Sequence, residues 1–495
     1  MRLGFLLNQE TCIGCHACTV ACKSEHRVPL GAFRTWVKYV EKGTFPDVRR
    51  HFSVMRCNHC DDAPCIPICP TNALFRRPDG VVDFDPAACI GCKSCMQACP
   101  YDALYIDPET ETAAKCNFCA HRLDAGLEPA CVIVCPVQAI VVGDLDDPES
   151  SLAKLAANGG VVRKPELGTR PKTFYLGADP ASLDPLIERD RGPYPFSGPG
   201  PAPPEGDPAD VREIYDVPHP APWGWKVWSY LWTKSIAAGA LLAAALLGLV
   251  RPQFADHPLV ASVAPAVALV FIAITALLLI FDLRRPERFW YMMIRPNWNS
   301  WLVRGSVALG AFGAVALGWL VARGPVLFAI SIPISLAAAG YTAFLFRQAK
   351  GREFWGSKWL LPHLLVQALV AGAASLAILA PMLEGGVQAL AFLGPLLGAS
   401  ICAHALFARL ESNPTHGSPH ARRAAEEISI GTHRRDFIRN VLVGGTTIPL
   451  ILLVLFPIAG AAGPSLTLIA SLLALRGLYR YERMWILAGQ AVPLS

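Results

Sequence analysis

Four cysteine quartets near the start of the chain constrain its chemistry more than any other feature. Of the seventeen cysteines, all but Cys402 belong to these quartets. They are Cys12, Cys15, Cys18 and Cys22; Cys57, Cys60, Cys65 and Cys69; Cys89, Cys92, Cys95 and Cys99; and Cys116, Cys119, Cys131 and Cys135. Closely spaced thiols followed by a more distant one are typical ligands of a [4Fe–4S] cluster. The spacing therefore predicts four [4Fe–4S] clusters, with all of these cysteines as metal ligands.

Two other uses of cysteine fit the sequence less well. A disulfide framework is typical of small secreted chains, and Met1–Thr11 does not have the pattern of a secretory signal. A zinc-ribbon array is the alternative to iron–sulfur. Structural zinc uses pairs of CxxC rather than triplets, so the quartets fit zinc less well. Three quartets also end in Cys-Pro, within segments typical of bacterial ferredoxins. These segments are CPTNAL, CPYDAL and CPVQAI.

Composition divides the chain into three segments. Residues 1–190 are cysteine-rich and charged, 191–222 are rich in proline and glycine, and 223–495 consist of long apolar runs. The first segment predicts a four-cluster ferredoxin-like domain, and the second predicts a semi-rigid, extended linker. The net charge of +5 comes from basic residues at the edges of the apolar runs. No basic patch with interleaved aromatic residues indicates a nucleic-acid partner.

The third segment predicts eight membrane-spanning helices, because a span needs about 20 mostly apolar residues. The expected spans are 228–250, 259–281, 302–322, 325–346, 359–382, 387–408, 440–460 and 465–487. Trp223, Trp225, Trp228 and Trp232 crowd the entry to the first span, as an interfacial aromatic belt does. The expected fold class is therefore α+β, a double bacterial-ferredoxin-like domain followed by an eight-helix transmembrane bundle in a lipid bilayer.

Charges in the connections predict the orientation. Fifteen Lys and Arg residues lie in and beside the connections after the second, fourth and sixth spans, whereas the opposite connections hold only Arg251 and Arg323. Basic loops stay on the cytoplasmic side, and an even number of spans puts both ends of the chain there. We therefore expect a multi-pass protein of the cell (inner) membrane, with the cluster domain on the cytoplasmic face.

Polar side chains that enter the spans predict a quinone site at the cytoplasmic end. Ionisable groups inside a membrane are costly and usually functional, and a quinone headgroup needs donors, acceptors and a proton route. The candidate cofactor-binding residues are Tyr230, Lys234, Asp282, Arg288, His363 and Arg476. An alternative for Lys234 and Arg304 is that they extend to the lipid headgroups. An alternative for His404 is a bundle histidine whose hydrogen bonds are satisfied.

Two residues inside the expected spans carry separate predictions. Arg476 lies about 12 residues into the last span, hence roughly 18 Å along its axis, past the middle of a core about 30 Å thick. It is expected to face the bundle interior and to pair with Asp282 or Glu411. Cys402 is expected to be a small apolar core residue.

Several motifs of the chain resemble known families. The four quartets resemble the four-cluster subunits of molybdopterin oxidoreductases of the polysulfide and dimethyl sulfoxide reductase type. DLRRPERFW at Asp282–Trp290 resembles the D-L-G-R-P-x-R-F-W of the NrfD/PsrC membrane subunits, with Arg284 in place of glycine, and AGQ at Ala488–Gln490 also fits. SWLVRGS at Ser300–Ser306 is closer to the S-W-L-S-R-E of the dimethyl sulfoxide reductase anchor. The chain thus resembles a fusion of the two subunits.

The resemblance to ferredoxins implies that the quartets exchange ligands. In two-cluster ferredoxins the fourth cysteine of a run binds the other cluster, and in the four-cluster family the first quartet pairs with the fourth, and the second with the third. The implied sets are Cys12, Cys15, Cys18 and Cys135; Cys116, Cys119, Cys131 and Cys22; Cys57, Cys60, Cys65 and Cys99; and Cys89, Cys92, Cys95 and Cys69. Cys22 lacks the proline that follows the other closing cysteines, and the spacing does not explain why.

The resemblance also implies a function. The chain would be a non-catalytic redox subunit that anchors a separate molybdenum or tungsten (molybdopterin) catalytic subunit to the membrane. Electrons would pass through the four clusters between that subunit and the quinone pool, either menaquinone or ubiquinone, in a direction that the sequence leaves open. The alternative is a redox-coupled proton-translocating membrane subunit. That function needs ionisable residues across the whole bilayer, and the outer halves of the spans have almost none.

Overall fold

The chain forms two compact units. The computed structural model describes residues 1–43, 46–189, 211–322, 325–415 and 417–495. Met1–Pro222 and Pro493–Ser495 make up the first unit, and Trp223–Val492 make up the second. The second unit begins where the apolar segment was expected to begin. Residues 191–210 of the predicted linker lie outside the described residues.

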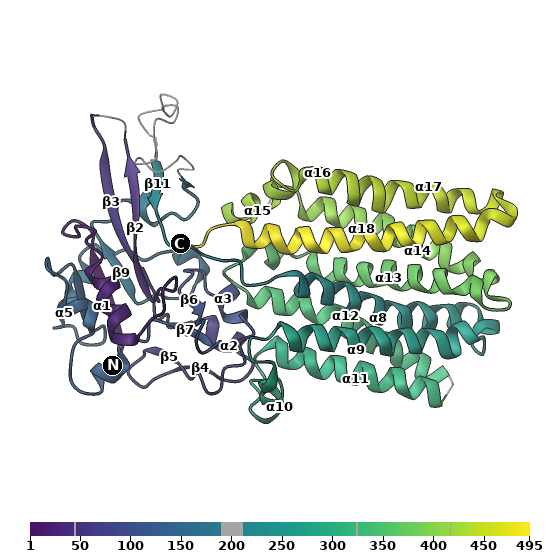
Figure 1. The fold of residues 1–495 in the computed structure, drawn as a ribbon, viewed down its shortest axis with the longest axis horizontal. Coiled ribbons are helices and arrows are strands. Elements are labelled where there is room, and N and C mark those ends of the chain that lie inside the picture. Colours follow the sequence, from purple (N-terminus) through teal and green to yellow (C-terminus); the bar gives the residue numbers. More distant parts are fainter. Residues whose placement is uncertain (44–45, 190–210, 323–324, 416) are drawn as a thin grey trace. The chain divides into compact units, whose positions relative to one another are not determined.

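The first unit is built from small sheets and short helices (Figure 1). A three-stranded sheet has the order β8-β1-β9, and a four-stranded sheet has the order β10-β11-β2-β3. Two hairpins, β4-β5 and β6-β7, complete the strands. In chain order the strands are β1 Leu3–Asn8, β2 Thr35–Lys42, β3 Arg49–Arg56, β4 Leu74–Arg76, β5 Val82–Phe84, β6 Leu104–Ile106, β7 Ala113–Lys115, β8 Ile140–Asp144, β9 Thr173–Leu176, β10 Glu188–Arg189 and β11 Val211–Tyr215.

The prediction of an extended linker over residues 191–222 is wrong for residues 211–215. Val211–Tyr215 form strand β11, which pairs antiparallel with β2 from Val211 opposite Lys42 to Tyr215 opposite Tyr39. Inside this sheet, Lys38 of β2 forms a buried ion pair of 3.0 Å with Glu213. The strand forms because Val211, Ile214 and Tyr215 favour extended structure and because β11 pairs with both β10 and β2. The proline-rich surroundings suggested no strand.

His219 fastens the chain that follows β11 to the first unit. Its Nδ1 lies 2.7 Å from Asp102 Oδ2 and its Nε2 lies 3.3 Å from Asp216 Oδ2. Burial alone would lower the pKa of His219, but the hydrogen bonds and charges of Asp102 and Asp216 outweigh burial and raise the pKa to about 9. His219 is therefore protonated at neutral pH, and we call its contacts with Asp102 and Asp216 the His219 clamp.

The His219 clamp predicts a pH-dependent stability of the first unit. Since the folded pKa lies above the unfolded value of about 6.5, the contribution is complete below pH 6.5 and is lost as the pH rises through about 9. It amounts to roughly 3 kcal/mol at most. Thermal unfolding of the full chain, followed by visible cluster absorbance, should show His219→Gln below wild type at pH 6 and equal to it above pH 9. A difference that does not change with pH would contradict the clamp.

The second unit contains eight helices that are long and apolar enough to cross a membrane, counted over the described residues, and they run side by side (Figure 1). The spans are Trp225–Val250, Leu259–Asp282, Trp301–Val321, Val326–Gln348, Leu360–Met382, Gly386–Glu411, Arg434–Ile458 and Gly460–Ala491. Their main helices are α8 Trp225–Val250, α9 Ala264–Asp282, α11 Trp301–Val321, α12 Pro325–Gln348, α13 Leu360–Leu379, α14 Leu390–Glu411, α17 Ile448–Leu455 and α18 Gly463–Ala491. The prediction of eight spans is confirmed.

Helix α8 is the most buried span of the second unit: 83% of its most apolar stretch is buried, against 22% for the span Leu259–Asp282. Small residues let its backbone approach α13 closely, as is usual between membrane helices. A Cβ on Gly239 would lie 1.8 Å from the carbonyl oxygen of Ala368, so only glycine fits there. At the end of α18, the side chain of Gln490 binds both the backbone N–H and the carbonyl of Trp223 at 3.0 and 2.9 Å. This contact ties the last span to the start of the first.

Candidate functional site

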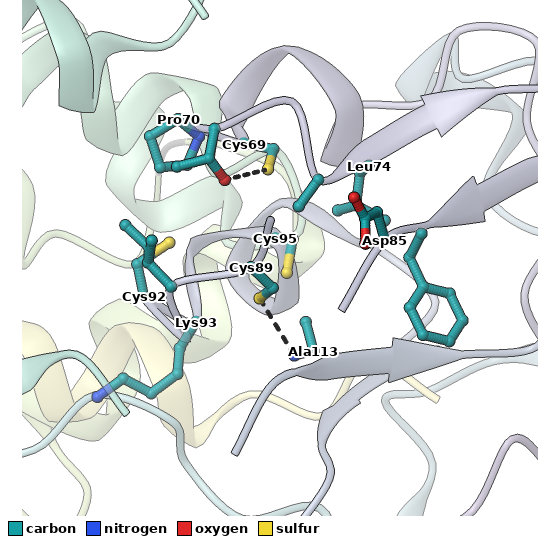
Figure 2. A pocket seen from close by; sticks show the side chains of 13 residues that line it. Cys69, Pro70, Leu74, Asp85, Cys89, Cys92, Lys93, Cys95 and Ala113 are labelled. Atoms are coloured by element: carbon teal, nitrogen blue, oxygen red, sulfur yellow. Dashed lines mark hydrogen bonds between the residues drawn. The ribbon is translucent and has the colours of Figure 1, made fainter. Parts of the chain in front are cut away.

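One cavity of the first unit is surrounded by four thiols from two quartets. Cys89, Cys92 and Cys95 line it together with Cys69 of the preceding quartet. Figure 2 shows the labelled thiols arranged around the hollow. We call this the Cys69 site. Its composition, three clustered thiols and one remote thiol, is the set implied by ligand exchange.

Local backbone conformation explains how these thiols come together. Gly91 and Lys93 have positive φ angles of 68° and 64°, a turn that points successive N–H groups inward and suits anionic sulfur. The N–H groups of Gly91 and Ala113 each donate to Cys89 Sγ at 3.4 Å. Helix α3, Ser94–Ala98, follows and presents Cys95.

Proline determines where two of the short helices end. Cys69 closes α2, Cys65–Ile68, and Cys99 closes α3, and both are extended, with ψ of 118° and 116°. A residue before proline is disfavoured in a helix, so each helix stops at its cysteine. Cys22 has no following proline, and its helix α1, Ala17–His26, continues for one more turn. Because no proline ends the helix at Cys22, its last turn includes His26.

A second cavity repeats this arrangement with the first and fourth quartets. Cys116, Cys119 and Cys131 line it together with Cys22, and we call it the Cys22 site. The ring of His26 also lines this cavity, and its Nε2 lies 3.2 Å from Cys119 Sγ. Burial, with a contribution from Arg34, lowers the pKa of His26 to about 4. The neutral imidazole can therefore donate one N–H to the sulfur.

The remaining thiols form two further groups, in each of which other thiols raise the pKa of a group member. Burial raises the pKa of Cys12, and the charges of Cys135 and Cys15 add to the rise. Burial likewise raises the pKa of Cys65 far above its usual value, with added contributions from other thiols of its group. We call these groups the Cys135 site, comprising Cys12, Cys15, Cys18 and Cys135, and the Cys99 site, comprising Cys57, Cys60, Cys65 and Cys99.

The thiol groups suit iron–sulfur clusters better than zinc. A zinc ion needs all its sulfurs about 2.3 Å away. Over the residues that the structure describes, no three His, Cys, Asp or Glu side chains are placed to hold a single metal ion. Thiols that surround a cavity can bind the corners of a larger cluster. Burial also raises the pKa of Cys18 to about 11 and that of Cys116 to about 12, so cluster binding would release protons.

A buried hydrogen-bonded network joins three spans of the second unit. His363 of α13 contacts Glu411 of α14 (Nδ1 to Oε2, 3.0 Å) and His404 of α14 (Nε2 to Nδ1, 2.9 Å). Tyr481 of α18 donates to the same Glu411 oxygen at 2.7 Å. With Glu411 ionised, His363 donates to it and accepts from His404. Among the residues that the structure describes, His404 Nε2 and Glu411 Oε1 are both buried without a hydrogen-bond partner. The two ends of this His363 network are therefore free to bind a further polar group.

A second buried group surrounds Lys234 of α8. Its ammonium is fully buried and donates to the Ala339 carbonyl at 2.7 Å and to Thr342 Oγ1 at 2.6 Å, both on α12. It also lies 5.2 Å from the ring centroid of Tyr341. Glu482 of α18 attracts Lys234 electrostatically, yet both Glu482 oxygens are buried and have no hydrogen-bond partner within the described part of the chain. We call these residues, with the buried Tyr230, the Lys234 group.

The structure brings some of the predicted site residues together. Tyr230 and Lys234 lie in one group, and Asp282 at the end of α9 acts electrostatically on Tyr230. His363 belongs to the separate His363 network, and Arg288 is partly buried near the end of the second span. Lys234 does not extend to the headgroups, because it is fully buried. Arg304 is exposed and donates to the Trp298 carbonyl at 2.7 Å.

Two predictions about the spans are wrong. Arg476 is exposed and donates to Asn440 Oδ1 at 3.0 Å, rather than facing the interior. Glu411, its expected partner, is already bound by His363 and Tyr481. Cys402 is exposed on α14 and is not a core residue, since a small apolar thiol is tolerated at a lipid-facing position.

Sequence reasoning missed several polar residues of these groups. Glu411 was named only as a partner for Arg476, and Tyr341, Tyr481 and Glu482 were not named. The signal was present in the segment YRYERM, where Glu482 stands inside the last apolar span. An acid within a span is a functional candidate by itself.

Comparison with known proteins agrees with this geometry. Residues 215–493, more than half of the chain, match the family described as polysulphide reductase, NrfD. This chain is a member of the NrfD family. Residues 48–145 also match the 4Fe-4S dicluster domain, so the first unit is an iron–sulfur domain. The NrfD match includes every residue of the His363 network and the Lys234 group.

The NrfD-family chain also has curated relatives, each of which matches more than a third of its length. It is 47% identical over 193 residues to a subunit of tetrathionate reductase from Salmonella typhimurium, covering 38% of this chain and 77% of the relative. It is 42% identical over 181 residues to a polysulfide reductase subunit from Wolinella succinogenes, covering 35% and 94%. It is 36% identical over 225 residues to the arsenate respiratory reductase iron-sulfur subunit of a Shewanella species, covering 36% and 96%. The chain thus combines a ferredoxin-like electron-transfer part with an NrfD membrane part.

Proposed function

We propose that this NrfD-family chain is the electron-transfer and membrane-anchor subunit of a molybdopterin oxidoreductase complex. It moves electrons between a separate catalytic subunit and membrane quinone through four [4Fe–4S] clusters. The observation that carries the proposal is the combination, on one chain, of four thiol groups with a membrane unit that holds buried, incompletely partnered polar side chains. A series of clusters needs an electron donor at one end and an electron acceptor at the other. The buried polar groups of the membrane unit would bind one of the two, a lipid-soluble quinone.

The catalytic partner is proposed from the relatives and from the surface. The relatives are named as subunits of tetrathionate, polysulfide and arsenate reductases, so each works beside another subunit. Next to the Cys135 site, Ile13 and Ile133 are 55% and 60% exposed, and Cys15 is an exposed thiol. Exposed apolar side chains around a thiol group suit docking of a protein that exchanges electrons there. We place the molybdenum or tungsten partner at this face.

The quinone site is proposed from the Lys234 group, Asp282, Arg288 and the His363 network. A bound quinone would accept or release two electrons together with protons. Tyr230 and Lys234 would donate hydrogen bonds to a headgroup oxygen, and the unpartnered carboxylate of Glu482 would accept one. His404 Nε2 is free to take a proton, after which His404 Nδ1–H can pass one to His363 Nε2, and His363 Nδ1–H to Glu411. Arg476 is left out of this proposal because it is exposed.

The chain is a multi-pass membrane protein, and we propose that its cluster domain lies on the cytoplasmic face of the inner membrane. The basic connections support this orientation. The alternative of redox-coupled proton translocation would need ionisable groups through the whole bilayer. In the described spans, the ionisable side chains lie towards the end that carries the basic connections. We therefore propose proton exchange at one side only.

Purification of the full chain with its bound partners tests this function. The complex should contain about 16 iron atoms per copy of this chain, should contain a molybdenum or tungsten subunit, and should reduce or oxidise a quinone analogue. In proteoliposomes, proton uptake or release should equal the quinone chemistry and occur on one side. Iron far below this value, or no reaction with any quinone, would refute the proposal. Proton movement across the bilayer during turnover would favour the pump.

A further inference from the structure

A buried arginine, Arg56, lies among the thiols of the first unit. It is the last residue of β3 and directly precedes Cys57 of the Cys99 site. Its backbone lies opposite Thr35 in the β2–β3 ladder, so the sheet determines where its side chain starts. Only 1% of the residue is exposed, and water therefore cannot solvate its charge. A buried guanidinium of this kind needs anionic or hydrogen-bonding partners.

The protein provides Arg56 with few such partners. Its guanidinium lies 4.4 Å from the ring centroid of Phe5, and Nη1 donates to Cys131 Sγ at 3.4 Å. Nε and Nη2 are buried and have no hydrogen-bond partner among the described residues. The charges that act on Arg56 most strongly are those of Cys131, Cys116 and Cys18. The side chain also lines the cavity of the Cys22 site.

These contacts fit an anionic cluster. Four thiolates around a [4Fe–4S] core carry a net negative charge, which grows by one when an electron is added. A fixed positive charge at the wall of the cavity stabilises the reduced state more than the oxidised state. Hydrogen bonds to the sulfurs act in the same direction, and charge and hydrogen bonding are both known determinants of cluster potential.

We propose that Arg56 raises the reduction potential of the cluster at the Cys22 site and, through Cys18, that of the cluster at the Cys135 site. This inference rests on the proposed function, because it assumes that the thiol groups hold clusters. Arg56 itself is neither oxidised nor deprotonated; its charge favours the electron that arrives from the partner or from quinol. Because the guanidinium of Arg56 acts on both clusters, each of the two sites becomes a favourable place for an electron to reside.

Redox titration of the full complex, followed by EPR, tests the role of Arg56. Arg56→Gln removes the charge and should lower the equilibrium constant for reduction of the Cys22-site cluster at least tenfold, a shift of about 59 mV to more negative potential. Arg56→Lys keeps the charge and loses the planar fork, so a smaller shift in the same direction is expected. Arg163 offers a matched control: it is 2% exposed but donates to the Leu494 carbonyl at 3.0 Å. Arg163→Gln should leave this midpoint unchanged.

The possible outcomes separate the inference from the proposed function. If Arg56→Gln has full iron content and unchanged midpoints, the inference is wrong although the function stands. If Arg56→Gln loses iron, Arg56→Lys decides: a midpoint that falls by the full shift of about 59 mV although the charge is retained would show that the charge does not set the potential, and would overturn the inference. If the wild-type complex shows no cluster signals, the inference and the proposed function both fail.

Discussion

Replacing His363 with leucine should lower the rate of quinone turnover by about two to four orders of magnitude, the usual contribution of a general acid–base group. His363 is the centre of its network, because its two ring nitrogens contact Glu411 and His404. Leucine breaks both contacts and leaves the Glu411 carboxylate with Tyr481 as its remaining partner. The proton path ends, while the cluster domain is untouched. Steady-state quinone reduction or quinol oxidation by the complex measures the loss.

Controls distinguish lost proton transfer from lost folding. His257 is a histidine in the connection between the first two spans, where its Nε2 contacts the Glu384 carbonyl at 3.0 Å. His257→Leu should therefore retain turnover within a few-fold. Iron content and the EPR signals of the clusters should be the same in both variants and in wild type. Asp282→Leu, which alters the surroundings of Tyr230, should also abolish turnover. Near-normal quinone turnover in His363→Leu would exclude the proposed proton route.

The outline of the protein could be predicted from the sequence because two of its signals are local. Sixteen thiols at ligand spacing, and eight apolar stretches of membrane length, need no knowledge of the tertiary structure. The short strand β11 was missed because its five residues carry a weak signal beside a proline-rich stretch, and pairing with β10 and β2 decides its conformation. Strands of this kind are stabilised by their neighbours more than by propensity.

The quinone site was only partly predictable, because membership of a buried group depends on helix rotation. Arg476 and Glu482 lie six residues apart on α18, yet one is exposed and the other is 2% exposed. Their positions along the helix are visible in the sequence, but the face that each occupies is set by packing against α8 and the π-helical segment Phe437–Thr447. The sequence also shows the charge of Lys234, but it does not show that Ala339 and Thr342 of α12 accept its hydrogen bonds.

We expect the quartets to exchange ligands, and iron analysis of cysteine variants can test this expectation. Cys95→Ala should lose the cluster at the Cys69 site, up to about four of about 16 iron atoms, and interrupt electron flow through the chain. Cys69 lines the same cavity as Cys95, although it belongs to another quartet. The double variant Cys69→Ala/Cys95→Ala should therefore lose no more than one cluster. Iron analysis of the purified complex, with EPR of the remaining clusters, measures both.

A second pair of substitutions reverses the expectation and decides between the two ligand schemes. Cys65 and Cys69 share a quartet, but Cys65 belongs to the Cys99 site. Cys65→Ala/Cys69→Ala should therefore damage two clusters and remove up to about eight iron atoms. If each quartet instead held its own cluster, this pair would remove only about four, and Cys69→Ala/Cys95→Ala would remove about eight. Cys402→Ala, at the exposed cysteine outside the quartets, should remove none. Because the two schemes predict opposite orders for the same two double variants, differences in expression or cluster loading common to both cannot imitate the result.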